Sequence, residues 1–211
     1  MIDLSLLDRA KTNAIVIRHA ERDDMQKWQI EQPLNDEGKQ HATELGKKLK
    51  GFKNYVFFSS PVDRCRETVE YMQKGILNDV TKPCDFSDLL GRPGAFVVDR
   101  NNNAFRTNPS CIDVVMAQIA HEKLEGIRPT EEGAKLLTDF TVGQMNIVPE
   151  GTLLVFVTHD AIIAPLIFEL TGEKFDRNNW PDFSDGFIIE KYSGTDYKVF
   201  RKGKIFKLRV F

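Results

Sequence analysis

The chain has 211 residues, of which 41% are hydrophobic and 28% charged, and its formal net charge is −2. This length and composition predict a globular protein with room for one full α/β domain, rather than a disordered or fibrous chain. The nearly balanced charge argues against a general nucleic-acid surface, and no apolar run reaches the roughly 18 residues of a membrane span.

Strands and helices alternate along the first half of the chain. A short apolar run at residues 14–18 is typical of a strand buried on both faces, and a second run lies at 55–58. Between them we expect a helix over 36–50, because Asn35 is a suitable N-cap, acids follow it and lysines end the segment. Ser60 and Pro61 predict the cap and first residue of another helix, which continues to about residue 74.

The second half of the chain begins with an irregular region and ends in strands. Residues 81–109 are rich in proline, glycine and asparagine and predict loops, with one candidate strand at 95–98. Further helices are expected over 111–124, 129–145 and 160–170, a strongly buried strand over 153–157, and closing strands over 186–190, 197–200 and 205–210. We therefore predict a single domain over 1–211, with an insertion at roughly 85–130. Its fold class is a three-layer α/β/α sandwich with a mostly parallel central sheet.

The N-terminal segment and the cysteines bear on the cellular setting. Residues 1–13 carry charges among their apolar residues and lack the pattern of a signal peptide. The three cysteines, Cys65, Cys84 and Cys111, have no paired spacing and predict neither a disulfide framework nor a zinc site. We expect a cytoplasmic protein with no membrane or nucleic-acid partner, and the sequence leaves its oligomeric state open.

Polar and charged residues follow three of the predicted strands, at the point where each strand ends. The first loop begins Arg18-His19, the second contains Arg64 in the first turn of its helix, and the third begins with His159 and Asp160. Because the carboxyl ends of parallel strands meet at one edge of a sheet, the three loops can lie over one cleft. Guanidinium groups beside imidazoles suit an anion with several oxygens, phosphate above all.

Four short motifs occur in a fixed order across residues 14–170. They are Arg18-His19, then Leu34-Asn35-Asp36-Glu37-Gly38, then the segment from Ser59 to Thr68, and finally His159 after a buried strand. In these motifs the chain resembles the histidine phosphatase superfamily, which has the phosphoglycerate mutase-like fold. The resemblance covers most of the chain.

The resemblance implies covalent catalysis at His19. A neutral His19 would attack phosphorus in line and form a phosphohistidine, which water then hydrolyses. Arg18, Arg22, Arg64 and His159 would bind the oxygens of the transferring phosphoryl group. No metal ion or other cofactor is expected, because the arginines and the second histidine already supply the neutralising charge.

The proton donor divides the superfamily. In the acid phosphatase branch it is the aspartate after the second histidine, which is Asp160 here, and it would protonate the leaving oxygen and then activate water. In the mutase branch it is a glutamate of the region after the helix of the third motif, Ser59 to Thr68. That region offers Asp85 and Asp88 here, but no glutamate between positions 80 and 110. The site pattern therefore resembles the acid phosphatase branch more closely.

The first loop departs from the acid phosphatase pattern R-H-G-x-R-x-P. Ala20 replaces its glycine and Asp24 its proline, so the branch's substrates cannot be carried over. Glu21, Asp23 and Asp24 are expected at the mouth of the cleft, where they could select the substrate. Arg22 could instead form ion pairs with these three acids.

Other assignments remain open for several residues. His159 could be a hydrogen-bonded core histidine, and Asp160 could serve only as the N-cap of its helix. Cys65 could be a nucleophilic thiol of low pKa or simply a small buried residue.

Several functions also remain open. The leading hypothesis is a metal-independent phosphomonoesterase acting on a phosphorylated small molecule or glycan, with a phosphoprotein as a further option. A phosphoglycerate mutase-like phosphotransferase and a protein phosphohistidine phosphatase are alternatives within the superfamily. Outside it, the chain could be a catalytically silent phosphate-binding module. It could also be a metal-dependent phosphohydrolase, with ligands drawn from His19, Asp23, Asp24, His159 and Asp160.

Overall fold

The structure is a computed structural model that describes residues 2–23, 32–78, 82–91, 93–108 and 110–208. Its strands form one seven-stranded sheet with the order β3-β2-β4-β1-β5-β6-β7. The strands β1 to β4 are parallel to one another, whereas β5 is antiparallel to β1, and β6 and β7 continue the sheet in antiparallel pairs. The strands are β1 (Asn13–Arg18), β2 (Asn54–Ser59), β3 (Cys84–Phe86), β4 (Thr152–Thr158), β5 (Gly186–Ser193), β6 (Asp196–Arg201) and β7 (Lys204–Lys207).

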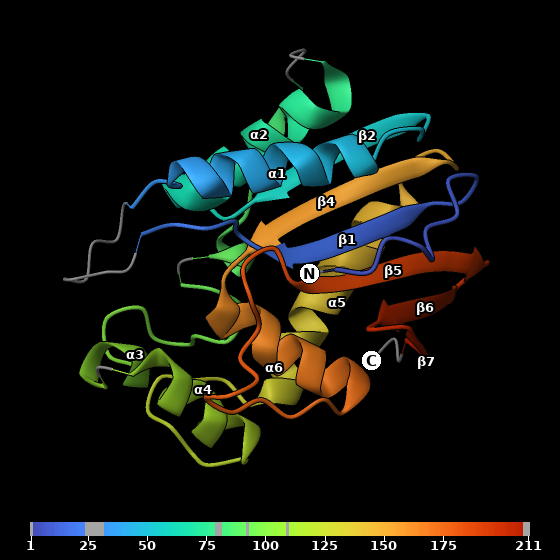
Figure 1. Cartoon of the computed structure of the whole chain (residues 1–211). Helices are drawn as coiled ribbons and strands as arrows, with labels where there is room; N and C mark the ends of the chain where they lie inside the picture. The colour runs from blue at the N-terminus through green and yellow to red at the C-terminus, as the bar shows by residue number, and fades with distance from the viewer. Residues whose placement is uncertain (1, 24–31, 79–81, 92, 109, 209–211) are drawn as a thin grey trace.

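Helices cover both faces of this sheet. Figure 1 shows α1 and α2 on one face, and α5 and α6 on the other. The helices are α1 (Asp36–Lys48), α2 (Asp63–Leu77), the 3-10 helix η1 (Asp88–Leu90), α3 (Ala104–Thr107), α4 (Cys111–Ile119), α5 (Thr130–Asn146) and α6 (Asp160–Thr171). This arrangement confirms the predicted three-layer sandwich.

Alternate residues of the central strands build the two cores. In β1, Ile15 and Ile17 pack with the residues of α1 and α2, whereas Ala14 and Val16 pack with those of α5 and α6. Successive side chains of a strand point to opposite faces, so a strand covered on both faces must be apolar throughout. This requirement explains why continuous apolar runs in the sequence predicted β1 and β4. None of the described helices has the length and apolar character that a membrane crossing would need.

The predicted start of the helix after β2 was wrong by two residues. The helix α2 begins at Asp63, and its N-cap is Val62 rather than Ser60. The side chain of Ser60 does not cap the helix, because its Oγ lies 2.9 Å from Nε2 of His159.

The insertion also differs from its prediction. Residues 95–98 form no strand, and Val97 makes only an isolated bridge to Ile127. The guanidinium of Arg128 binds the backbone carbonyls of Ala95 and Val97, so a side chain takes acceptors that a neighbouring strand would have used. The strand found here is β3, which the prediction missed because it is only three residues long and largely exposed at the sheet edge.

The helix α4 is shorter than expected. It ends at Ile119, five residues before the predicted end at 124. His121 has a φ angle of +61°, in the left-handed region, and a residue in this conformation ends a helix.

Candidate active site

Three neighbouring strands deliver the predicted site residues to one edge of the sheet. The strands β2, β4 and β1 are adjacent, and their carboxyl ends lead into Ser60, His159 and His19 respectively. The backbone N–H of His19 donates to the carbonyl of Thr158 at 2.9 Å, and that of Ser60 donates to Val157 at 3.0 Å. The three loops therefore leave the sheet side by side, as the sequence predicted.

His19 is a buried imidazole in one defined hydrogen-bonding state. The residue is 2% exposed, and its Nδ1 lies 2.8 Å from the carbonyl oxygen of Ala20. Its Nε2 accepts a hydrogen bond from Nε of Arg64 at 3.0 Å. A carbonyl can only accept and a guanidinium can only donate, so the ring proton sits on Nδ1 and the lone pair on Nε2.

The surroundings of His19 favour its neutral form. Burial, followed by the nearby His159, Arg64 and Arg18, lowers the pKa of His19 well below 6.5. Both causes penalise a further positive charge. At neutral and mildly acidic pH, His19 therefore carries an available lone pair on Nε2.

Arg64 connects His19 to the second histidine. Its Nη2 lies 3.0 Å from Nδ1 of His159, and Nε2 of His159 lies 2.9 Å from Oγ of Ser60. Since Arg64 must donate, His159 accepts at Nδ1 and donates from Nε2 to the serine. The two imidazole rings are 5.6 Å apart between centroids. One guanidinium thus orients both rings.

Asp160 lies next to Arg18 at the start of α6. Nη2 of Arg18 is 2.9 Å from Oδ2 of Asp160, and the same oxygen accepts a hydrogen bond of 3.1 Å from the indole of Trp180. Burial raises the pKa of Asp160, but Arg18, Trp180, His159 and the backbone of Ala161 together bring it below its ordinary value. In the unliganded site, Asp160 is therefore a carboxylate.

The remaining motif residues hold the loop that follows β1. A Cβ on Gly38 would lie 2.1 Å from the carbonyl oxygen of Glu21, so only glycine allows α1 to approach this loop. Oγ of Thr68 accepts from the N–H of Ala20 at 3.0 Å and donates to the carbonyl of Arg64 at 2.7 Å. The glycine of the second motif and the threonine of the third therefore fix the position of His19.

Comparison with known proteins agrees with this geometry. The family model of the histidine phosphatase superfamily (branch 1) matches residues 14–88, which include β1, β2 and β3. In these residues the chain is similar to the histidine phosphatase superfamily. A curated relative described as the uncharacterized phosphatase PhoE of Bacillus subtilis (strain 168) is 25% identical over 177 residues, covering 76% of this chain and 78% of PhoE.

Solved structures show the fold across nearly the whole chain. YhfR of Bacillus stearothermophilus superposes with a TM-score of 0.59 at 18% identity, covering 91% of this chain and 96% of YhfR. A phosphoglycerate mutase from Bacillus anthracis str. Sterne gives a TM-score of 0.56 at 19% identity, covering 93% and 92% of the two chains. The fold is therefore phosphoglycerate mutase-like. The closer resemblance to the acid phosphatase branch is not confirmed by these comparisons.

A segment that sequence reasoning did not assign to the site also borders it. Nη1 of Arg18 donates to the carbonyl of Pro181 at 2.7 Å, and the ring of Phe183 lies 4.2 Å from the guanidinium carbon of Arg18. The Phe183 ring is also 5.6 Å from that of His19. The only signal in the sequence was the pair of aromatic residues, Trp180 and Phe183, in an otherwise polar stretch.

The other residues of the first loop have partners within the loop and on the neighbouring helix. Nη1 of Arg22 donates to Oε1 of Gln32 at 2.8 Å and to the carbonyl of Asp23 at 3.2 Å. Oε1 of Glu21 lies 2.9 Å from Nδ1 of His41. Asp23 is exposed, and the proposed selecting residue Asp24 lies outside the described residues.

The two acids of the insertion are on the surface. Asp85 and Asp88 are exposed, and Asp88 forms a 3.4 Å ion pair with Arg100. In the described part of the chain, neither acid forms a hydrogen bond or ion pair with His19 or Asp160. Of the candidate donors, Asp160 is the one that contacts the arginine preceding His19.

Cys65 is a buried residue of the site. Its Sγ is 3.5 Å from Nε2 of His159, and burial raises the pKa of its thiol to about 12. The group is protonated at neutral pH, which disfavours the thiol nucleophile considered above. Within the described ranges, no group of three or more His, Cys, Asp or Glu residues is placed to hold a metal ion.

Proposed function

We propose that this protein is a metal-independent phosphatase that hydrolyses a phosphomonoester through a phosphohistidine intermediate on His19. The observation that carries the proposal is the neutral, buried His19, with its Nε2 lone pair directed at Arg64. A nucleophile of this kind needs positive groups that bind the phosphoryl oxygens without protonating the imidazole.

The buried guanidinium of Arg18 supports the phosphate assignment. Arg18 is 9% exposed, and its Nε has no hydrogen-bond partner among the described atoms. A buried donor without an acceptor is unfavourable, and a phosphate oxygen would supply one. We propose that Arg18, Arg64 and His159 bind the phosphoryl oxygens and that Arg22 adds a further donor.

In the proposed reaction, Nε2 of His19 bonds to phosphorus while the bond from phosphorus to the leaving oxygen breaks. Asp160 gives its proton to that oxygen. Water then attacks the phosphohistidine, Asp160 takes the proton back, and inorganic phosphate leaves. Asp160 begins as a carboxylate, but a phosphate dianion beside it would raise its pKa and engage Arg18, so substrate binding would favour the protonated form.

We propose that these residues act in a single domain spanning 1–211, with the segment 85–130 and the acids Glu21, Asp23 and Asp24 contacting the leaving group. The fitting substrates are phosphorylated small molecules or glycans, and a cytoplasmic protein would meet both. Similarity to a mutase at 19% identity concerns the fold alone.

The test is hydrolysis of an aryl phosphate in EDTA by the wild type and by His19→Ala. The variant should lose at least about a thousandfold in kcat, and acid-labile label from a radioactive phosphoryl donor should appear on the wild type alone. His121→Asn is the matched control, because His121 is exposed and its left-handed backbone tolerates asparagine. No turnover by the wild type, or turnover only with added metal, would overturn the proposal.

The pH profile tests the two proposed roles together. Activity needs neutral His19, which exists above its lowered pKa, and protonated Asp160, which exists below the pKa of the substrate complex. The two conditions overlap at acidic pH, so kcat should peak there and decline toward neutral and alkaline pH. A profile that rises steadily from pH 5 to pH 8 would contradict the role of Asp160.

A further inference from the structure

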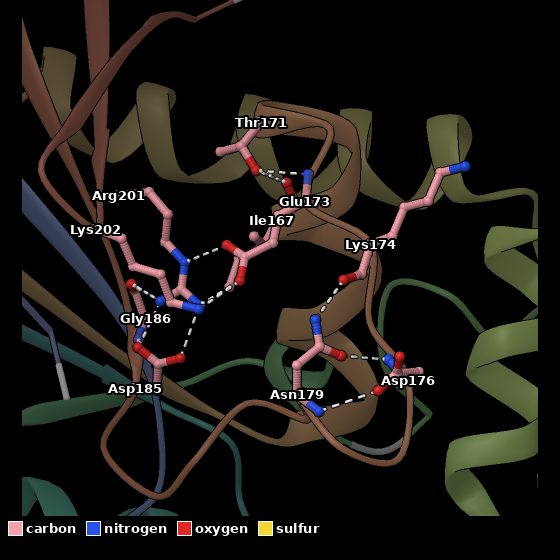
Figure 2. Close-up of polar contacts among 10 residues, drawn as sticks. All are labelled: Ile167, Thr171, Glu173, Lys174, Asp176, Asn179, Asp185, Gly186, Arg201 and Lys202. Carbon is pink, nitrogen blue, oxygen red and sulfur yellow. Dashed lines mark hydrogen bonds and ion pairs between the residues drawn. The ribbon is translucent and has the colours of Figure 1, made fainter.

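Arg201 is a buried arginine at the end of β6, outside the motifs of the superfamily. It is 4% exposed, and Figure 2 shows its guanidinium between two carboxylates. Nε donates to Oε2 of Glu173 at 2.9 Å, while Nη1 and Nη2 donate to the two oxygens of Asp185 at 2.5 and 2.8 Å. Nη1 also binds the carbonyl of Gly186 at 2.7 Å. Only the planar fork of arginine can satisfy two acids in this way.

The two carboxylates stand at opposite ends of one loop. Glu173 follows the C-cap of α6, Gly172, and Asp185 immediately precedes β5. By binding both, Arg201 closes residues 173–185 into a ring. We call these residues the 173–185 loop.

The first half of the 173–185 loop is held by its own hydrogen bonds. The N–H of Asp176 donates to Oδ1 of Asn179 at 2.6 Å, and the N–H of Asn179 donates to Oδ1 of Asp176 at 3.1 Å. Nδ2 of Asn179 also binds the carbonyl of Lys174 at 2.8 Å (Figure 2). Fixing the ends of such a loop therefore fixes its middle as well.

Residues in the second half of the 173–185 loop contact the candidate active site. Trp180 binds the carboxylate of Asp160, Pro181 accepts from Arg18, and Phe183 covers the guanidinium of Arg18. At the end of the loop, the carbonyl of Asp185 accepts from the backbone N–H of Arg18 at 2.9 Å. The loop thus holds Arg18, which precedes the proposed nucleophile, and Asp160, the proposed proton donor.

We propose that Arg201 is a positioning residue of the active site, acting through the 173–185 loop on Arg18 and Asp160 without touching the substrate. The effect on turnover rests on the proposed function, whereas the effect on the placement of Trp180 does not. Ion pairs desolvated to this degree are stable only when every partner is present, so they favour a single loop conformation.

Glu173→Gln is the main test, because Arg201→Met would leave two carboxylates without their cation and could fail to fold. Glutamine keeps the size of the side chain but loses the ion pairs with Arg201 and Lys202 at one end of the loop. The matched control is Glu169→Gln, since Glu169 is one helical turn away at the same end of α6 and binds Thr130 instead. Arg201→Lys is a third variant, because lysine keeps the charge without the fork.

Two readouts are measured on each variant. The first is kcat for an aryl phosphate across pH, for which Glu173→Gln and Arg201→Lys should lose about tenfold at the optimum, as expected when reacting groups are misplaced. Their alkaline limb should also move to higher pH, because Arg18 and Trp180 then lower the pKa of Asp160 less. Besides Arg18 and His159, the titratable groups that face Asp160 are Cys65 and Cys111, whose thiols stay protonated because burial raises their pKa values.

The second readout needs no turnover. In a Trp28→Phe background, Trp180 is the one remaining tryptophan of the chain, and its emission should titrate with the Asp160 carboxylate that accepts its N–H. The midpoint should move to higher pH in Glu173→Gln and Arg201→Lys, and stay in place in Glu169→Gln.

The outcomes separate the two proposals. A moved emission midpoint without phosphatase activity in the parent protein would support the role of Arg201 and overturn the proposed function. The role of Arg201 would be overturned if Glu173→Gln and Arg201→Lys kept normal turnover, the same alkaline limb of the pH profile and the same midpoint of the Trp180 emission titration. Equal losses in Glu173→Gln and Glu169→Gln would also overturn it, because they would reflect general loosening at the end of α6.

Discussion

The site draws on the two halves of the sheet in different ways, and two buried arginines show the contrast. Arg18 ends β1 in the parallel half, and its Nε has no acceptor among the described atoms. Arg201 ends β6 in the antiparallel half, and its Nε, Nη1 and Nη2 all have carboxylate acceptors. The first arginine retains binding capacity for an anion, whereas the second uses its capacity within the protein.

The surroundings of these arginines differ in the same sense. In the parallel half, Arg18 and Arg64 lie beside two histidines and one carboxylate, so positive charge is in excess. In the antiparallel half, Arg201 and Lys202 together balance the charges of Glu173 and Asp185. A site that binds anions needs the first arrangement, and a support that fixes a loop needs the second.

The largest effect should come from the parallel half, at Arg64. Arg64→Met removes the guanidinium that contacts both histidines and is expected to lower kcat by about a hundredfold to a thousandfold, as for other donors to a transition state. Arg66→Met is the matched control, because Arg66 is exposed on the same helix and pairs with Asp63. Steady-state hydrolysis of an aryl phosphate measures both. Equal losses would show that the two arginines act through general charge rather than through contact with the histidines.

The next largest effect is expected at Asp160, which contacts Arg18 of the parallel half and Trp180 of the 173–185 loop. Asp160→Asn cannot supply a proton, so it should slow hydrolysis of an alkyl phosphate by about a hundredfold and that of a nitrophenyl phosphate far less. Asp88→Asn is the comparison, since Asp88 is the exposed acid that pairs with Arg100 in the insertion. A dependence on the leaving group that appears in Asp88→Asn instead would assign the proton donor to the insertion.

A smaller effect on kcat is expected at Gly91, which packs against the serine that binds His159. A Cβ on Gly91 would lie 2.1 Å from Oγ of Ser60, the group that binds His159. Gly91→Ala should therefore lower kcat by about tenfold and destabilise the fold by about 1–3 kcal/mol, the usual cost of overpacking. In Gly143→Ala, the added methyl meets nothing within 4 Å and should stabilise α5 slightly. Denaturant unfolding and kinetics on both variants check this.

The smallest effect should be a loss of stability at acidic pH that comes from the ion pairs of Arg201 with Glu173 and Asp185. Burial raises the pKa values of Glu173 and Asp185, but Arg201, with Lys202 at Glu173, brings them below their ordinary values of 4.5 and 3.8. Stability from a lowered carboxyl pKa is complete above the ordinary value and is lost as pH falls toward the lowered one. The free energy of unfolding in urea should thus decline below about pH 4.5, and less steeply in Glu173→Gln. An equal slope in both proteins would exclude this contribution.

Much of the parallel half was predictable because its information is local. Burial on both faces requires continuous apolar runs, which revealed β1, β2 and β4, and the residues directly after them include His19 and His159. The motif that contains Arg64 placed this arginine in the first turn of α2, where the structure has it. The fold and most of the candidate site followed from these segments alone.

The ion pairs of Arg201 were not predictable, because they join residues that lie far apart in the chain. Arg201 meets Glu173 across 28 positions and Asp185 across 16, and no periodicity of apolar residues indicates which charges will pair. Ser60 illustrates the same limit, since its local pattern predicted a helix cap, whereas the tertiary structure pairs it with His159 from β4's loop. The sequence by itself determined the layers of the fold and the groups that follow its strands. Only the tertiary structure decided which buried polar groups pair, because that choice depends on the distances and desolvation created when the segments pack.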